Sequence, residues 1–142
     1  MIITNKELKE LSLNLAKVSG LSGVKFAFAV AKNSAKIKSE LSTIQEVVNT
    51  IKGLNEYDEE RKSAFETFNK TADGKKPTKE DEALLTEQIA NLDEKYKDSI
   101  KEWNDLMDQE IDFDEHKIKK SNLPEDITAA QLEGILSIID DE

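Results

Sequence analysis

Two long amphipathic patterns, separated by a short turn, constrain the fold of this chain more than any other feature of its sequence. The first covers residues 24–70 and begins with VKFAFAVA, a stretch so apolar that burial on several sides is expected. A heptad-like seam follows, in which Ser34 fills the one place without an apolar side chain. The seam predicts a long helix with a shift of register near Gly53. Its apolar members are Val30, Ile37, Leu41, Ile44, Val48 and Ile51.

The second pattern follows TADGKKPT, residues 71–78, whose Asp-Gly pair, lysines and proline are typical of a turn. From Lys79 to about Asp108 the apolar residues again recur at helical spacing. They are Leu85, Ile89, Leu92, Tyr96, Ile100, Trp103 and Met107. A short connection between two long amphipathic helices predicts a long antiparallel helical hairpin over residues 24–109.

Two capping boxes predict shorter helices near the ends of the chain. In each, a threonine is followed three residues later by a side chain that can accept a hydrogen bond from the threonine N–H. The pairs are Thr4 with Glu7, and Thr128 with Gln131. The first predicts a helix from about Asn5 to Val18, ended by the glycine-containing stretch 20–23, and the second predicts a short last helix.

We therefore expect a mainly α protein that forms a single domain over residues 1–142. Its parts are an N-terminal strand and helix (1–23), the hairpin (24–109), and a strand-like segment with a C-terminal helix (110–142). The strand-like segment begins EIDFDEHKIKK and alternates in polarity with period two. We expect it to pair with Ile2 and Ile3 in a small two-stranded β patch.

The polar face of this strand-like segment carries Asp112, Asp114 and the only histidine, His116. These residue types bind metals, but on one strand the three would extend over about 14 Å, too far for a single ion. Ile111 and Phe113 occupy the opposite face, as a half-buried strand requires. A solvated polar face is therefore favoured, and no metal site is predicted here.

Residues 69–80 have partial agreement with a calcium-binding loop, because Gly74 falls at the sixth position and Glu80 at the twelfth. Asp73 would then be the fifth-position ligand. The first position is Asn69 rather than aspartate, and lysines crowd the loop. An ordinary hairpin turn is the favoured interpretation.

No catalytic or cofactor-binding residues are predicted, and we expect a non-enzymatic protein. The absence of cysteine excludes disulfides, thiolate nucleophiles and zinc–thiolate sites. The sequence contains no P-loop, no G-x-G-x-x-G motif and no nucleophile-elbow serine to place beside His116.

Charge is divided unevenly along the chain. The net charge is −10, with +4 on residues 1–55 and −14 on residues 56–142. An acidic surface disfavours nucleic acid and anionic membranes, and it favours a protein partner with a basic surface. Nineteen of the twenty basic residues are lysine, so the bidentate recognition of phosphate by arginine is nearly absent.

Four stretches of the chain resemble a group of small uncharacterised proteins of tailed phages and prophages. They are ITNKEL, FAVAKNSAKIKSEL, EIDFDEHKI and ITAAQLEGILSIIDDE. The group has no assigned chemistry, so the resemblance implies a phage setting without a mechanism. Since the chain also lacks an apolar run of the ~20 residues that span a bilayer and a secretory-signal pattern, we expect it in the host cytoplasm or on the virion.

The expected function is a protein–protein interaction module, used in particle assembly or in binding a host protein. The residues expected to bind the partner are Phe113, Ile118, Leu132 and Ile135. One alternative is an acidic mimic of DNA that occupies a host DNA-binding or defence protein, with carboxylates from Glu80 to Asp114 on one continuous face. The other is a self-assembling coiled coil, in which the seam from Ile37 to Ile51 pairs between copies.

Overall fold

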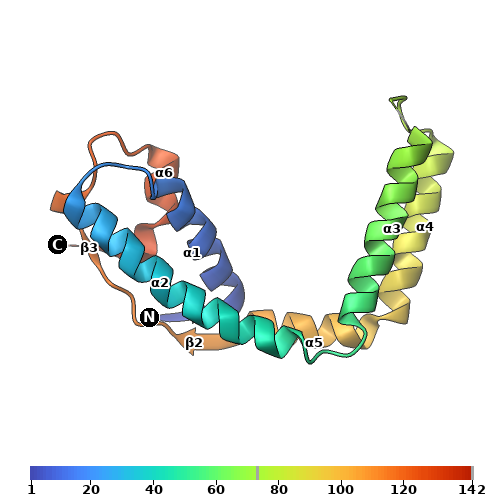
Figure 1. The fold of residues 1–142 in the computed structure, drawn as a ribbon, viewed down its shortest axis with the longest axis horizontal. Helices are drawn as coiled ribbons and strands as arrows, with labels where there is room; N and C mark the ends of the chain where they lie inside the picture. Colours follow the sequence, from blue (N-terminus) through green and yellow to red (C-terminus); the bar gives the residue numbers. More distant parts are fainter. Residues whose placement is uncertain (73, 142) are drawn as a thin grey trace. The chain divides into compact units, whose positions relative to one another are not determined.

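The computed structural model describes residues 1–72 and 74–141, which form two compact units (Figure 1). Unit 1 combines Met1–Gln45 with Leu106–Glu142, and unit 2 is Glu46–Asp105. Helices dominate both units, so the predicted mainly α fold class is confirmed. The single domain stays a prediction, because two compact units can belong to one domain.

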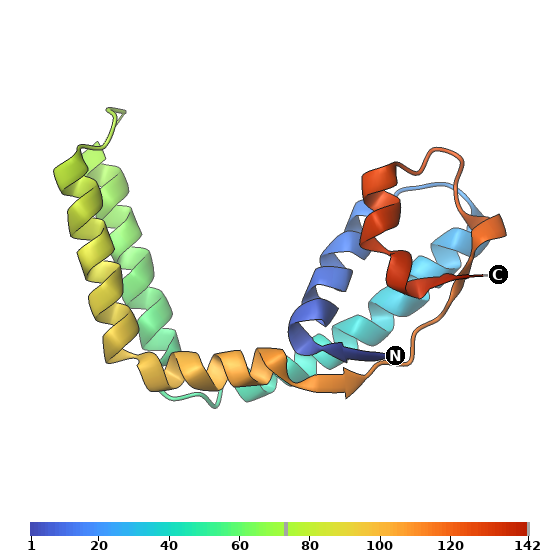
Figure 2. The same ribbon diagram turned by 180° about the vertical axis from the view of Figure 1, so that it is seen from behind.

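Unit 1 consists of helices and very short strands. Its elements are β1 (Ile2–Thr4), α1 (Asn5–Val18), α2 (Val24–Val48), β2 (Glu110–Asp112), β3 (Ile118–Lys119), α6 (Ala129–Gly134) and β4 (Ile139–Asp140). The last three residues of α2 belong to unit 2. Both predicted capping boxes are present at the starts of α1 and α6, and α1 has the predicted bounds. Seen from behind, α6 lies beside α1 (Figure 2).

The core of unit 1 is formed by one face of α1, one face of α2 and residues 106–142. Asn33 is buried on α2, whereas Ser34 is exposed, so the prediction that Ser34 lies in the seam is wrong. A polar side chain is tolerated there because Asn33 has hydrogen-bond partners inside the unit. The largest fully buried side chains are Phe26, Leu8, Leu15, Ile37, Ile118, Ile135, Ile138, Val18 and Asn33.

The predicted two-stranded patch is confirmed. Strands β1 and β2 pair antiparallel, with Ile3 opposite Ile111. Strand β2 ends at Asp112, which is earlier than the alternating pattern suggested. A second pair, the parallel strands β3 and β4 with Ile118 opposite Ile139, has no counterpart in the prediction.

The last helix is shorter than its apolar pattern predicted. It ends at Gly134, and a 3₁₀ turn (Leu136–Ile138) leads into β4. A Cβ atom at Gly134 would lie 2.8 Å from Cγ of Asn14, so this glycine permits the close approach of α6 to α1. Beyond that contact the chain extends because Ile139 pairs with Ile118.

Unit 2 contains the helical hairpin. Its elements are α3 (Leu54–Ala72), α4 (Lys79–Lys95) and the first nine residues of α5 (Lys97–Asp108). Helices α3 and α4 lie side by side along their length (Figures 1 and 2). Thr78 caps α4 by accepting a hydrogen bond from the N–H of Asp81. A hairpin is therefore present, but its first arm is α3 alone rather than one helix from residue 24.

Two interruptions divide the helices that were predicted to be continuous. At Gly53 the backbone has a φ of +85°, and a Cβ atom there would lie 2.9 Å from Oγ of Ser99. Helix α2 ends at Val48 and α3 begins at Leu54, so the shift of register predicted near Gly53 is instead a break over residues 49–53. The second predicted helix breaks at Tyr96, whose ring packs edge-on against Tyr57 with centroids 5.7 Å apart. No glycine or proline marks this second break.

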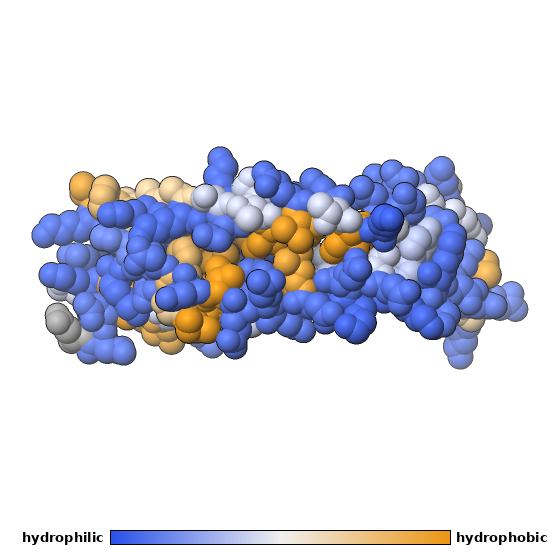
Figure 3. Space-filling view, turned by 90° about the horizontal axis from the view of Figure 1, so that it is seen from below, coloured by the Kyte–Doolittle hydropathy of each residue, from blue (hydrophilic) through white to orange (hydrophobic). Residues whose placement is uncertain are grey.

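The exposed surface is largely polar. In the space-filling view from below, hydrophilic side chains cover most of the face, with hydrophobic side chains between them (Figure 3). Among the residues that the structure describes, no helix combines the length and the apolar character needed to cross a membrane.

Candidate functional site

Unit 1 contains a groove between the start of α2 and the chain around β3. Its volume is about 740 Å³. We call it the lysine groove, because lysines contribute to both of its sides. Its principal lining residues are Val24, Lys25 and Phe28 from α2, and His116, Lys117 and Lys119 from the other side.

The start of α2 gives the groove its apolar surface. The stretch VKFAFAVA is apolar nearly all round. Burial on several sides was predicted for it, and this prediction is only partly correct. Phe26, Ala29 and Val30 enter the core, while Val24 stays 88% exposed and Phe28 stays 61% exposed. A helix can direct only part of its circumference towards one core, so the remaining apolar side chains face solvent. Two large apolar residues thus lie exposed within one turn of each other.

Hydrogen bonds from α2 fix the opposite side of the groove. The Asn33 amide donates to the carbonyl oxygen of His116 and accepts from its N–H, both at 2.8 Å. Three residues along α2, Lys36 donates from Nζ to the Asp114 carbonyl oxygen at 2.8 Å and approaches its carboxylate at 3.2 Å. The segment from Asp114 to His116 is therefore attached to α2 without being part of a strand.

Two rings meet in the groove. Phe28 and His116 lie edge to face, with centroids 6.0 Å apart and planes at 83°. Nζ of Lys32 lies 5.8 Å from the centroid of the Phe28 ring, within the range of a cation–π contact. The exposed Phe28 ring thereby contacts both His116 and Lys32.

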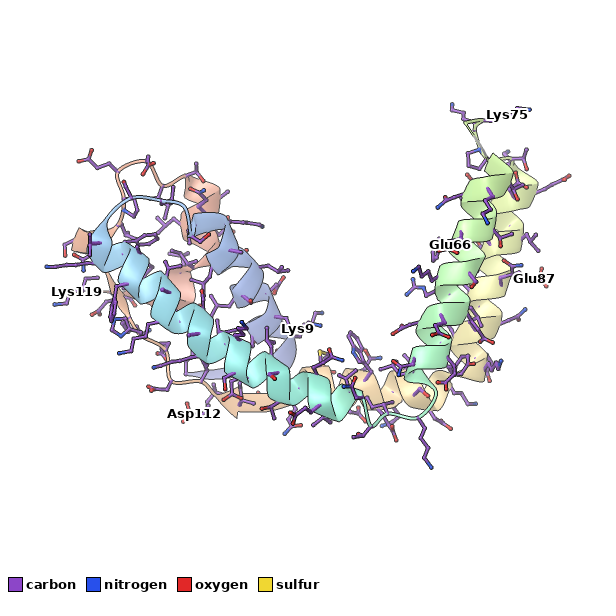
Figure 4. All side chains as sticks on the ribbon, viewed as in Figure 1. Lys9, Glu66, Lys75, Glu87, Asp112 and Lys119 are labelled. Atoms are coloured by element: carbon purple, nitrogen blue, oxygen red, sulfur yellow. The ribbon has the colours of Figure 1, made fainter. Side chains whose placement is uncertain are left out.

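The electrostatic character of the groove is opposite to that of the whole chain. Residues 11–39 and 116–124 contain eight lysines and no aspartate or glutamate. Lys119 projects from β3 near the start of α2 (Figure 4). Glu115 lies 3.4 Å from Nζ of Lys117, Asp114 pairs with Lys36, and Asp140 lies opposite Lys119 in the β3–β4 register. None of these three carboxylates is among the lining residues of the groove. A protein with net charge −10 thus has a locally cationic surface.

The three polar residues considered as a metal site are occupied separately. Asp112 lies 3.3 Å from the ammonium group of Met1, Asp114 pairs with Lys36, and His116 packs against Phe28. Within residues 1–72 and 74–141, no group of three metal-ligating side chains is close enough to hold an ion. Asp73, the fifth position of the calcium-loop pattern, lies outside the described residues.

The Met1 ammonium is also a structural partner of Glu115. The two lie 2.9 Å apart, and the ammonium donates to the Phe113 carbonyl oxygen at 2.7 Å. The hydrogen bond from the ammonium lowers the pKa of Glu115, and the same bond raises the pKa of the ammonium. These contacts hold the chain beyond β2 against β1.

The residues expected to bind a partner lie mostly in the core. Phe113, Ile118 and Ile135 are 3%, 2% and 0% exposed, and Leu132 is half-buried. Three of the four therefore stabilise unit 1, since a buried side chain offers no surface to a partner. The exposed apolar residues Val24 and Phe28 were missed because helical spacing identifies apolar side chains without saying which of them the core covers.

The hairpin of unit 2 has a different surface, which we call the acidic hairpin, residues 54–95. It carries twelve acidic and seven basic residues. No side chain of α4 is fully buried, and Phe65 and Leu84 are 39% and 56% exposed. Glu66 on α3 and Glu87 on α4 project outward from the hairpin (Figure 4). Exposed apolar residues thus lie among exposed carboxylates.

Polar contacts join the two arms of the acidic hairpin. The Tyr57 hydroxyl donates to Oδ1 of Asp93 at 2.6 Å. This hydrogen bond, with burial adding to it, raises the pKa of Tyr57. On the same helices Lys95 pairs with Glu60 at 3.2 Å.

Comparison with known proteins provides no relative from which to transfer a role. The chain matches no protein-family model, no curated protein sequence and no solved structure. Its function must therefore be inferred from the two surfaces described above.

Proposed function

We propose that this chain is a non-enzymatic protein–protein interaction module of a tailed phage or prophage, acting in particle assembly or in binding a host protein. The acidic hairpin is the surface that holds the partner. The observation that carries this proposal is that α4 has no fully buried side chain, although its apolar residues recur at helical spacing. The resemblance of four stretches to small phage proteins supports the phage setting.

A pair of helices buries only a narrow seam, so its apolar residues remain half-exposed until another surface covers them. Leu85, Ile89 and Leu92 are in this state. A partner could therefore gain apolar contact along the hairpin, with the surrounding carboxylates favouring a basic partner surface. Charged residues around an apolar contact mainly set the rate of association and the choice of partner.

The test is affinity capture from infected and host cells, followed by reconstitution with the purified partner. Reversing three exposed acids, Glu59→Lys, Glu66→Lys and Glu87→Lys together, should weaken binding by at least about tenfold. Binding to the unmodified chain should weaken as salt rises. Reversal of three lysines on the same helices, Lys62→Glu, Lys70→Glu and Lys79→Glu, is the matched control and should leave binding as tight or tighter. A reconstituted complex that tolerates the acid reversals would contradict the proposal.

The two alternative functions have less support. A mimic of DNA needs carboxylates on one continuous face, and no single compact unit contains all of the carboxylates from Glu80 to Asp114. Self-assembly through the seam needs exposed apolar residues, but Ile37 is fully buried and Ile44 nearly so. Neither alternative is favoured by a specific contact.

A further inference from the structure

The lysine groove is a second surface with the features of a binding site, and it belongs to unit 1 rather than to the hairpin. Its volume of about 740 Å³ lies within the range of roughly 300–1,000 Å³ that ligand-binding clefts occupy. Val24 and Phe28 are among the most exposed large apolar residues described. The core does not require their side chains, because Phe26, Ala29 and Val30 fill this part of it.

Charge identifies the kind of ligand. Lys25, Lys117 and Lys119 line the groove, and no carboxylate is among its lining residues. Neither residues 11–39 nor residues 116–124 contain an aspartate or glutamate, although Glu115 directly precedes the second segment and pairs with Lys117. An isolated cationic surface on an acidic protein attracts an anion of limited extent, because beyond its edges the remaining charge repels one. The ligand is therefore anionic and short.

The choice between acidic polypeptide and nucleic acid rests on the side chains present. The groove offers one exposed phenylalanine ring, and that ring is already bordered by His116 and Lys32, whereas single-stranded nucleic acid is held by stacking successive bases. All of the cations are lysine, and the only arginine, Arg61, lies in unit 2. The planar guanidinium that binds phosphate in two-point contacts is thus missing. A long polyanion would also have to pass Asp114 and Asp140 at the edges.

We propose that the lysine groove binds an acidic segment of a partner protein. One apolar side chain of that segment packs on Val24 and Phe28, and its carboxylates face Lys25, Lys117 and Lys119. The apolar contact supplies most of the affinity, and the lysines supply selection and speed of association. Because the groove and the acidic hairpin are different surfaces, this proposal stands or falls independently of the function proposed for the hairpin.

The test uses fluorescence anisotropy with the full chain and a labelled peptide of about ten residues, glutamates with one central phenylalanine. Binding should weaken by at least about tenfold for Phe28→Ala, and likewise for Lys25→Glu combined with Lys117→Glu. Leu13→Ala and the pair Lys6→Glu and Lys9→Glu are matched controls on α1, an exposed leucine and two exposed lysines outside residues 11–39, and should leave the affinity within about twofold. Circular dichroism checks that each variant is folded.

Three results would overturn the proposal. The first is failure of the peptide to bind, or binding that is unchanged by both groove variants. The second is an oligothymidine of similar length that binds more tightly than the peptide and loses affinity with Phe28→Ala. The third is a dimer of the free protein, seen by sedimentation and dissociated by Phe28→Ala, which would assign the groove to a second copy of the chain.

Discussion

Asn33 holds the backbone of His116 through both of its amide atoms, although the two residues are 83 positions apart. The side chain is fully buried and makes the donor–acceptor pair that a neighbouring strand would otherwise provide. The amide also donates to the Ala29 carbonyl oxygen at 3.0 Å. One side chain thus attaches the non-helical side of the lysine groove to the core of unit 1.

Asn33→Asp should destabilise unit 1 by about 2–4 kcal/mol at neutral pH, because it buries an anion against the His116 carbonyl oxygen. A protonated carboxyl group can both donate and accept, so part of the loss should be recovered as pH falls. Chemical denaturation across pH measures both effects. Ser34→Asp adds the same charge at an exposed position of the same helix, and an equal effect there would remove the role assigned to Asn33.

Glu115→Gln should make stability less dependent on acid pH. The pKa of Glu115 is lowered below its ordinary value of 4.5 by the Met1 ammonium. As pH falls, Glu115 is therefore protonated first in the unfolded state. Its contribution to stability is present above about pH 4.5 and is lost as pH falls through its pKa in the folded state. Unfolding midpoints at neutral and acid pH should differ less in Glu115→Gln than in the parent. Glu125→Gln, at an exposed position, should retain the parent difference.

Gly53→Ala should destabilise unit 2 through two separate effects. A Cβ atom would be strained by the φ of +85° and would lie 2.9 Å from Oγ of Ser99 and 3.2 Å from Cδ1 of Tyr96. We expect a cost of about 2–3 kcal/mol by thermal or chemical denaturation. Gly74→Ala has positive φ but open space, and should cost about 1 kcal/mol. Gly20→Ala has neither problem. Equal effects at all three positions would contradict this explanation.

Tyr57→Phe should remove the hydrogen bond to Asp93 and cost about 1 kcal/mol of stability. In a double-mutant cycle with Asp93→Asn, the double variant should lose less free energy of unfolding than the sum of the losses in the two single variants. The pKa of Tyr57 is raised above its ordinary value of 10.0, so the contribution is present below that pH and is lost as pH rises through the folded value. The difference in free energy of unfolding between the parent and Tyr57→Phe should therefore become smaller at alkaline pH. Glu66→Gln, at an exposed position of α3, should be additive with Tyr57→Phe in the same experiment and serves as the control.

The helix starts could be predicted because their signals are local. Thr4 with Glu7 and Thr128 with Gln131 form hydrogen bonds within a few residues, so the sequence contains both partners of each cap. The pairing of Ile2 and Ile3 with the strand-like segment could also be predicted, because these two apolar residues had no other expected partner, whereas the register of Ile3 with Ile111 came from the structure.

The break at Tyr96 and the second strand pair could not be predicted, because they depend on distant contacts. The interruption near Gly53 was predicted, but only as a shift of register. Tyr96 has ordinary helix-forming neighbours, and the break there accompanies its packing on Tyr57. Ile139 continues the apolar spacing of a helix, yet it extends to pair with Ile118. Local preference amounts to a few tenths of a kcal/mol per residue, so tertiary pairing can override it.

The sequence by itself determined the helical class, the capped helix starts and the uneven charge, because each follows from neighbouring residues or from composition. Only the tertiary structure decided which apolar side chains are covered. Phe113, Ile118 and Ile135 are buried in the core, whereas Val24 and Phe28 are exposed and lie near lysines from two segments that are distant in sequence. The physical reason is that one hydrophobic face of a helix fits one core, and which face is chosen depends on everything packed against it.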